Sequence, residues 1–315
     1  MFRFSFEFLI DLRQKNLFDR PCANAYAGSV EGRHFSGTID SPRRLLKRSP
    51  LPRSYSDAVA RGMFHCLLTI QGLGAFALIT LVVILKKFRV ARPVIRPLIR
   101  REISRAGVKL LPMFLFLAAA LGFLVIGQAV SWLTRFGAFN YLGSIMVVVV
   151  VRELGPLLAA VLVLARVGTA NVIELGTARA LGEVEALEAL GIDPVHYLVV
   201  PRVIGLALGT FCLTVYLILG ALVSGYLWAF LQDVPVTPGE YFKQLAGALR
   251  GLDFALLALK TCAFGFTIAI VTCYNGLAQP LRLEEVSRAT VRAVAQSIIA
   301  FLVLDALFIV VYLLT

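Results

Sequence analysis

Two adjacent charged residues, Arg152 and Glu153, stand in the middle of an apolar run that extends from Gly143 to Gly176. Arg166 and Glu174 follow in the same run. A charged side chain at the centre of a bilayer costs roughly 2.5 to 3.5 kcal/mol on insertion scales, so such residues usually face a partner, a wet cavity or the lipid headgroups. The pattern therefore indicates charges that line the polar part of a cavity in a membrane protein.

The dipeptide Gly155-Pro156 follows this charged pair directly, and a proline at such a position predicts a kinked or broken helix. Neighbouring helical residues point about 100° apart, so Arg152 and Glu153 do not simply neutralise each other on one face. Two interpretations are open: a charged turn within a re-entrant hairpin, or a kinked span whose charges border a lipid path. The second is favoured, and it assigns acyl-chain contacts to three apolar neighbours: Val150, Leu154 and Leu157.

Lys260 and Asp305 are two further ionisable residues within apolar stretches. Such a residue is a functional-site hypothesis by default, and the alternative is a structural salt bridge between helices, in which these two residues could pair with each other. The structural interpretation is favoured for Asp305. Lys260 lies nearer the end of its stretch, where a lysine can extend its ammonium to the membrane surface. Glu153 has the same two interpretations: it faces a wet pocket, or it pairs with a buried cation.

The composition is that of an integral membrane protein. Of the 315 residues, 59% are hydrophobic and 16% are charged, against roughly 45–50% and about 25% in soluble domains. The sequence predicts an all-α integral membrane protein with an amino-terminal interfacial elbow helix and five transmembrane helices. The five predicted spans are 110–134, 139–170, 198–231, 253–275 and 293–314.

The part of the chain before the spans divides into two segments. Residues 1–56 are polar, basic and irregular, which predicts a poorly ordered extension. Residues 57–92 are apolar but interrupted by glycine and followed by many basic residues, which favours an interfacial helix over a span. Residues 93–315 form the predicted membrane domain. An organelle transit peptide is the alternative for the extension, against which three acidic residues stand: Glu7, Asp11 and Asp19.

Lysine and arginine in short loops predict the orientation of the spans. The basic flank at 86–109 should be cytoplasmic, and five spans then place the loops 171–197 and 276–292 on the same side. The net charge is +12, and most of it lies in the first 110 residues. We interpret it as a surface that faces lipid headgroups rather than a nucleic-acid site, because no basic pattern interleaved with aromatic residues accompanies it.

A short amphipathic helix is predicted directly after the charged span. Apolar residues recur every three positions from Leu181 to Leu190, with acidic residues between them, and Gly191 ends the pattern. A helix lying on the bilayer is one interpretation. Anionic lipids attract basic faces, however, so an acidic helix favours a protein partner. The docking helix is placed at about 177–190, with six contact residues: Arg179, Leu181, Glu183, Val184, Leu187 and Glu188.

The remaining chemistry-bearing residues form no recognisable site. The five cysteines lack CxxC spacing and are interpreted as core thiols, with neither a disulfide framework nor a metal. The chain contains no HExxH, GxSxG or P-loop motif, so it shows no hydrolase signature and cannot bind ATP by a P-loop. No cofactor is expected.

Two blocks of the chain resemble MlaE-type permeases, the membrane subunits of lipid-transporting ABC systems associated with MCE proteins. The first, at 150–204, reads VVRELGPLLAAVLVLARVGTANVIELGTARALGEVEALEALGIDPVHYLVVPRVI. The second, at 273–308, reads CYNGLAQPLRLEEVSRATVRAVAQSIIAFLVLDALF. The resemblance covers about residues 95–315. One departure is Leu181-Gly182-Glu183, where the family commonly has Thr-Glu-Gln. A glycine inside a helix costs about 1 kcal/mol, so we expect the partner contact to differ in detail.

The resemblance implies a homodimeric, multi-pass permease of the bacterial inner membrane that moves phospholipids or related lipids to or from a periplasmic MCE-domain protein. ATP hydrolysis would belong to a separate cytoplasmic ABC ATPase that docks on the helix at 177–190, and a small STAS-domain protein is a further expected partner. The chain itself would not be an enzyme. Carried over from the family, the lipid cavity would hold the Arg152–Glu153 pair, Lys260 and Arg292.

Two other classes of function remain as alternatives. A membrane-embedded lipid-modifying enzyme would use Glu153 or Asp305 as an acid or base, but no nucleophile or metal cluster accompanies them. A non-transporting membrane scaffold would have no use for charged side chains within the bilayer, whose insertion costs free energy. Co-purification of a P-loop ATPase would favour the permease over both.

Deletion of residues 2–50 is expected to leave transport largely intact, because nothing in this polar segment can form a core. Transport by the truncated chain, compared with the full chain at equal membrane abundance, checks this expectation. Complete loss of transport at normal abundance would show that the extension has a role of its own.

Overall fold

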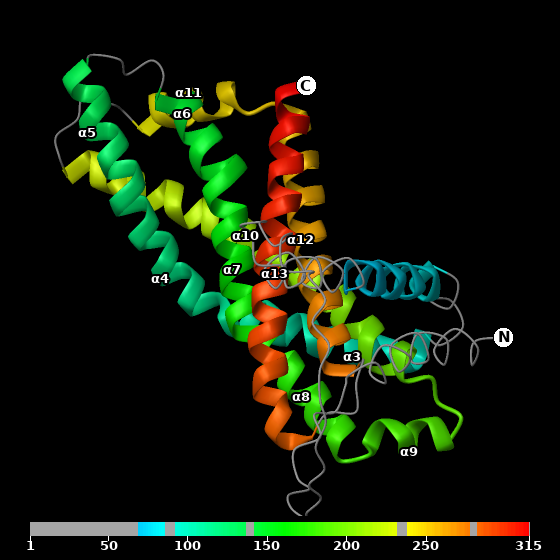
Figure 1. Cartoon of the computed structure of the whole chain (residues 1–315). Helices are drawn as coiled ribbons and strands as arrows, with labels where there is room; N and C mark the ends of the chain where they lie inside the picture. The colour runs from blue at the N-terminus through cyan, green and yellow to red at the C-terminus, as the bar shows by residue number, and fades with distance from the viewer. Residues whose placement is uncertain (1–68, 86–91, 137–141, 232–237, 278–281, 315) are drawn as a thin grey trace, which may run out of the picture. The chain divides into compact units, whose positions relative to one another are not determined.

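The computed structural model describes residues 69–85, 92–136, 142–231, 238–277 and 282–314 (Figure 1). The chain forms two compact units, Met1–Gly74 and Ala75–Thr315. The predicted extension at 1–56 lies outside the described residues. The boundary between the units falls inside the helix Thr69–Leu85 rather than at the predicted end of the elbow segment.

The described residues of the second unit are helical almost throughout and include no strand. Its first half contains α3 (Arg92–Ala106), α4 (Leu111–Leu121), α5 (Gly127–Phe136), α6 (Leu142–Met146), α7 (Gly155–Val163) and α8 (Thr169–Ala180), together with short 3-10 and π-helical segments that join them. Its second half contains α9 (Glu183–Ala189), α10 (Val200–Leu231), α11 (Pro238–Ala248), α12 (Gly251–Leu277) and α13 (Leu283–Leu314).

Five helices are long and apolar enough to cross a membrane, which confirms the predicted fold class. They are Arg96–Ala129, Val147–Ala180, Val195–Leu231, Gly251–Leu277 and Leu283–Leu314. The first begins earlier than predicted because the basic α3 continues into the apolar α4, and the second ends later because α8 extends the charged span.

The apolar helix that precedes these spans is shorter. Its described part runs from Thr69 to Leu85 and is shorter than the roughly 20 residues that a span needs. Its second half packs on the membrane domain, since the rings of Phe76 and Tyr274 lie with centroids 5.8 Å apart and Thr80 is fully buried. Its placement in the membrane interface stays a prediction.

The charged span is one continuous helix, so the re-entrant hairpin interpretation is wrong. Val147–Leu154 is π-helical, and α7 begins directly after it with Pro156 in its first turn. A proline lacks an N–H and is tolerated in a first turn, and a wider π turn before it removes the clash with the preceding carbonyl. The helix therefore does not break at Gly155-Pro156. It changes its pitch in the π-helical segment that precedes the proline.

Close contacts between helices hold α10 at the centre of the second unit, against α3, α4 and α12. A Cβ added at Gly265 of α12 would lie 2.6 Å from the carbonyl oxygen of Leu206 in α10. One added at Gly209 of α10 would lie 3.0 Å from the Cβ of Ala106 in α3. Small residues at helix contacts let backbones approach, and van der Waals packing then drives association within a membrane.

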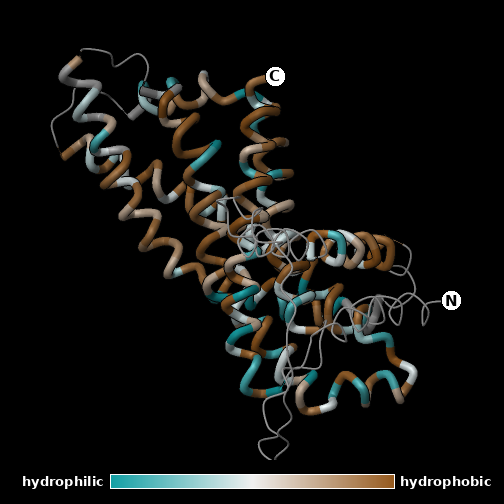
Figure 2. Tube along the Cα trace, viewed as in Figure 1, coloured by the Kyte–Doolittle hydropathy of each residue, from teal (hydrophilic) through white to brown (hydrophobic). Residues whose placement is uncertain are grey.

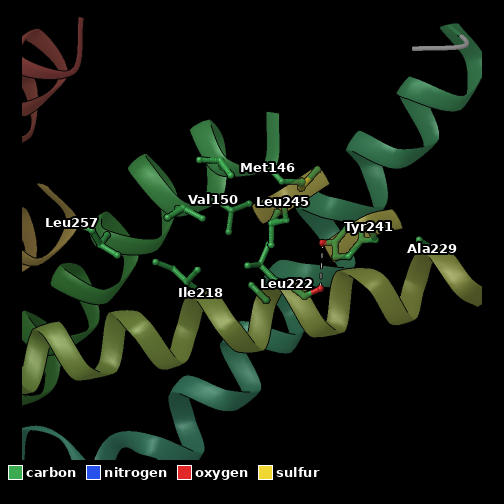
Figure 3. Close-up of a cluster of buried hydrophobic side chains, with 11 residues drawn as sticks. Met146, Val150, Ile218, Leu222, Ala229, Tyr241, Leu245 and Leu257 are labelled. Atoms are coloured by element: carbon green, nitrogen blue, oxygen red, sulfur yellow. Dashed lines mark hydrogen bonds between the residues drawn. The ribbon is translucent and has the colours of Figure 1, made fainter. Parts of the chain in front are cut away.

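A cluster of buried apolar side chains joins the charged span to α10 and α11 (Figure 3). Val150 and Ile218 pack in it, and Tyr241 of α11 reaches the carbonyl of Leu222, to which its hydroxyl donates over 3.4 Å. Burial raises the pKa of Tyr241 to about 12, so this hydroxyl stays protonated as a donor. The cluster therefore fixes α11 against the spans.

The second unit has two distinct ends. The short helix α9 and the start of α13 lie at one end, while α6, α11 and the carboxyl terminus lie at the other (Figure 1). Hydrophilic residues gather toward the α9 end, whereas α4 and α7 are mostly hydrophobic (Figure 2). The predicted placement of the loops 171–197 and 276–292 on one side agrees with this arrangement.

The Gly265→Ala variant should be less stable than wild type by about 1–3 kcal/mol, because the added methyl overlaps backbone atoms of α10. The matched control is Gly247→Ala in α11, where an added Cβ meets nothing within 4 Å. Thermal unfolding of the detergent-purified variants measures the difference. Equal unfolding midpoints for the two variants would show that α10 and α12 do not depend on this approach.

Candidate functional site

A network of charged side chains lies within the spans and is centred on Lys260 of α12. The ammonium Nζ of Lys260 is 2.7 Å from Oδ1 of Asp305 in α13 and 3.1 Å from Oε2 of Glu153. It also donates to the backbone carbonyl of Arg152 over 2.9 Å. The Lys260 side chain is fully buried, so the predicted extension of its ammonium to the membrane surface is wrong: the lysine is neutralised between two carboxylates instead.

Arg152 forms the second ion pair of the network. Its guanidinium lies 2.9 Å from Oδ1 of Asp253 in the first turn of α12. Its Cζ lies 5.1 Å from the centroid of the Tyr312 ring, a cation–π distance. Arg152 and Glu153 thus have separate partners, as the 100° between neighbouring helical residues requires. The network holds two cations and three carboxylates in all: Arg152, Lys260, Glu153, Asp253 and Asp305.

Sequence reasoning missed two residues of this site: Asp253, and Tyr312, whose ring contacts Arg152. Both lie seven residues from a residue that the sequence did single out: Asp253 before Lys260, and Tyr312 after Asp305. Seven residues are nearly two helical turns, so each pair shares a helix face. That spacing is the signal that would have found them.

The members of the network differ in exposure, and its exposed end is defined as the adjacent pair Arg152 and Glu153. The side chains of Asp253 and Asp305 are 5% and 9% exposed, whereas those of Arg152 and Glu153 are 23% and 29% exposed. Near the exposed end, the Nε of Arg152 and the hydroxyl of Tyr312 are buried without a hydrogen-bond partner among the described residues. Because buried polar groups are nearly always satisfied, these two atoms call for a partner such as a water or a polar ligand group.

The structure places the other predicted cavity residues in different environments. Leu154 and Leu157 are half-buried beside the charged pair. Val150 is 1% exposed and packs in the core cluster, so its side chain lines no cavity among the described residues. Arg292 is exposed on α13, thirteen residues before Asp305 and hence about 20 Å away along the helix. The structure does not bring Arg292 to the network.

The predicted docking helix is shorter than expected. Helix α8 ends at Ala180, Gly182 adopts a left-handed conformation with φ of 79°, and α9 begins at Glu183. Gly182 therefore lies between two helices rather than inside one, and the expected cost of an interior glycine does not arise. Val184 is buried, Leu187 is half-buried, and Leu181 and Glu188 are exposed. Arg179 lies 3.6 Å from Glu185 across the turn.

A second group of charges joins three helices near α9. Glu174 of α8 pairs with Arg105 of α3 and, at 3.1 Å, with Arg202 of α10. Arg202 also reaches the carbonyl of Asn171. The sequence singled out Glu174 as a charge within an apolar run, but not its partners. This group holds the amino-terminal helix of the first span against the second and third spans.

Comparison with known proteins identifies the family. The family described as Permease MlaE matches residues 99–311. A probable ABC transporter permease protein of Rickettsia prowazekii is 30% identical over 239 residues, which cover 76% of this chain and 91% of the relative. One of Synechocystis sp. is 31% identical over 207 residues, covering 64% of this chain and 76% of the relative.

A plant protein is also similar. The chloroplastic protein TRIGALACTOSYLDIACYLGLYCEROL 1 of Arabidopsis thaliana is 28% identical over 210 residues, which cover 65% of this chain and 58% of the relative. The family match contains Arg152, Lys260, Asp305 and the whole of α9. With five membrane-crossing helices and a family match over most of its length, this multi-pass membrane protein belongs to the MlaE permease family.

Proposed function

We propose that this chain is the permease subunit of an ABC transporter that moves phospholipids or related lipids between the bacterial inner membrane and a periplasmic MCE-domain protein. The observation that carries the proposal is the family match over residues 99–311, together with relatives that are named as ABC transporter permeases. The lipid cargo is supported by the Arabidopsis relative, whose name contains a glycolipid.

The exposed end of the charged network is the proposed cargo site. Arg152 and Glu153 present opposite charges at a partly exposed position within an apolar span. A polar headgroup or its hydration water would satisfy the free Nε of Arg152 and the Tyr312 hydroxyl. The half-buried Leu154 and Leu157 offer apolar contact to acyl chains without specific bonds. Two copies in a homodimer would bring two such sites to a shared path.

The short acidic helix α9 is the proposed contact for a separate cytoplasmic ATPase. Glu183 and Glu185 lie in its first turn, where carboxylates favour the helix dipole, and Glu188 is exposed on the last turn. Val184 anchors the helix by burial, while Leu190 is 76% exposed at its end. An apolar side chain beside exposed carboxylates suits a protein surface better than anionic headgroups. A small STAS-domain protein is proposed as a further subunit.

The Glu153→Gln and Asp305→Asn variants should separate cargo binding from folding. Asp305→Asn leaves Lys260 with one carboxylate in a buried setting and should destabilise the protein by about 3–5 kcal/mol. Glu153→Gln keeps the side-chain shape at the partly exposed end, so it should reduce lipid transport with a smaller loss of stability. Membrane abundance, thermal stability and transfer of a fluorescent phospholipid by the reconstituted complex are the measurements.

Two results would contradict this division of roles. If Glu153→Gln transports normally, the charged pair does not contact cargo. If Glu153→Gln is degraded like Asp305→Asn, then Glu153 acts only as the structural partner of a buried cation, which is the alternative that the sequence left open.

Replacement of Leu187 and Glu188 by lysine should uncouple ATP hydrolysis from lipid transport, because it cancels the negative charge of α9 without touching its buried anchor, Val184. Transport should fall at least about tenfold if the contact loses 1.4 kcal/mol or more. The control is Glu240→Lys, an exposed charge reversal on α11 at the other end of the unit. Normal ATPase co-purification and transport in the α9 variant would exclude α9 as the docking element.

A further inference from the structure

A pocket of about 340 Å³ opens between α3 and α8, apart from the charged network of Lys260. It is lined by Arg101, Ser104, Arg105, Lys109 and Glu174. Three of these residues are cations and one is a carboxylate, so the pocket is strongly basic. Arg101 and Arg105 are four residues apart on one face of α3, and Lys109 joins them in the pocket from the 3-10 turn Val108–Leu110.

The ion pairs leave this pocket with unmatched positive charge. Glu174 already pairs with both Arg105 and Arg202. Arg101 and Lys109 are exposed and form no ion pair with a described residue. Guanidinium and ammonium groups that converge on one pocket, with a serine hydroxyl among them, are the donors that bind phosphate oxygens. The net positive charge of the pocket therefore suits an anionic ligand.

The surroundings of the pocket indicate where that anion comes from. Exposed apolar side chains lie between and after the pocket residues along the chain: Val108, Leu115 and Phe116, which are 60%, 63% and 77% exposed. Helix α3, which carries most of the pocket, leads through Gly107 and the 3-10 turn Val108–Leu110 into α4, and both helices belong to the first membrane-crossing segment. A ligand with a phosphate head and apolar tails would contact both the basic pocket and the apolar side chains beside it. Burial of its tails adds affinity that a free phosphate lacks.

We propose that this pocket binds the phosphate of an anionic lipid headgroup, in the leaflet that faces α9, as a site separate from the cargo path. The bound phosphate joins α3 to α8 as a second anion beside Glu174. Because α8 leads through Gly182 into α9, such a lipid stabilises the arrangement of helices that presents α9. Lipid binding at this pocket requires that the protein lies in a membrane. It does not require that lipids are the transported cargo.

The test uses the purified full chain and compares its retention of phosphatidylglycerol and phosphatidylcholine with matched acyl chains, measured by native mass spectrometry. The wild type should prefer phosphatidylglycerol. The Arg101→Gln/Lys109→Gln variant should lose this preference by about fivefold for each removed charge. The control, Arg96→Gln/Arg100→Gln, removes two exposed charges from the same helix outside the pocket and should keep the preference.

The outcomes decide the proposal. An equal loss in the control variant would show diffuse attraction to a basic helix and would overturn the pocket. Displacement of the lipid by inorganic phosphate at equal concentration would identify a site for free phosphate and overturn the lipid source. The conservative Arg101→Lys/Lys109→Arg variant should retain the preference; its loss at unchanged thermal stability would show that charge in the pocket is not what binds the lipid.

Discussion

The burial of the Lys260 ammonium is the constraint on which the membrane domain depends. Removing an ion from water costs several kcal/mol even after relaxation, and carboxylates compensate only at short distance. Asp305 and Glu153 meet this condition at 2.7 and 3.1 Å, and they come from two different spans. A slide of any of the three helices by one turn, about 5.4 Å, would leave a buried charge unpaired. The ion pairs therefore fix the register of the second, fourth and fifth spans.

One span connects the two surfaces to which function is assigned. The span Val147–Ala180 contains Arg152 and Glu153 near one end and stops just before α9 at the other. Glu153 and Ala180 are 27 residues apart, or about 40 Å along a helix axis. The span changes its helical pitch in the π-helical segment Val147–Leu154, and such segments are frequent at functional sites. One span thus links the proposed cargo site to the turn that leads into the proposed ATPase contact, α9.

Much of this arrangement could be predicted from the sequence. Composition and apolar run length gave the five spans, and intramembrane charge singled out Arg152, Glu153, Lys260 and Asp305. The predictions that were wrong concerned residues whose environment is determined by helices distant in the sequence. The burial of Lys260 and the packing of Val150 follow from α10 and α13, which no local pattern reveals. Gly182 was placed inside a helix because hydrophobic spacing continues across a turn that only a positive φ discloses.

Photo-crosslinking from position 157 in the reconstituted complex tests the central claim, an ATP-driven lipid path beside Arg152 and Glu153. Leu157 lies one helical turn from Glu153 and is half-buried. Leu227 of α10, which is 50% exposed in an apolar span, is the matched position. We expect lipid adducts at position 157 that change with ATP hydrolysis and adducts at position 227 that do not. Adducts at position 157 that are absent, or that match those at position 227 with and without ATP, would contradict the proposed lipid path.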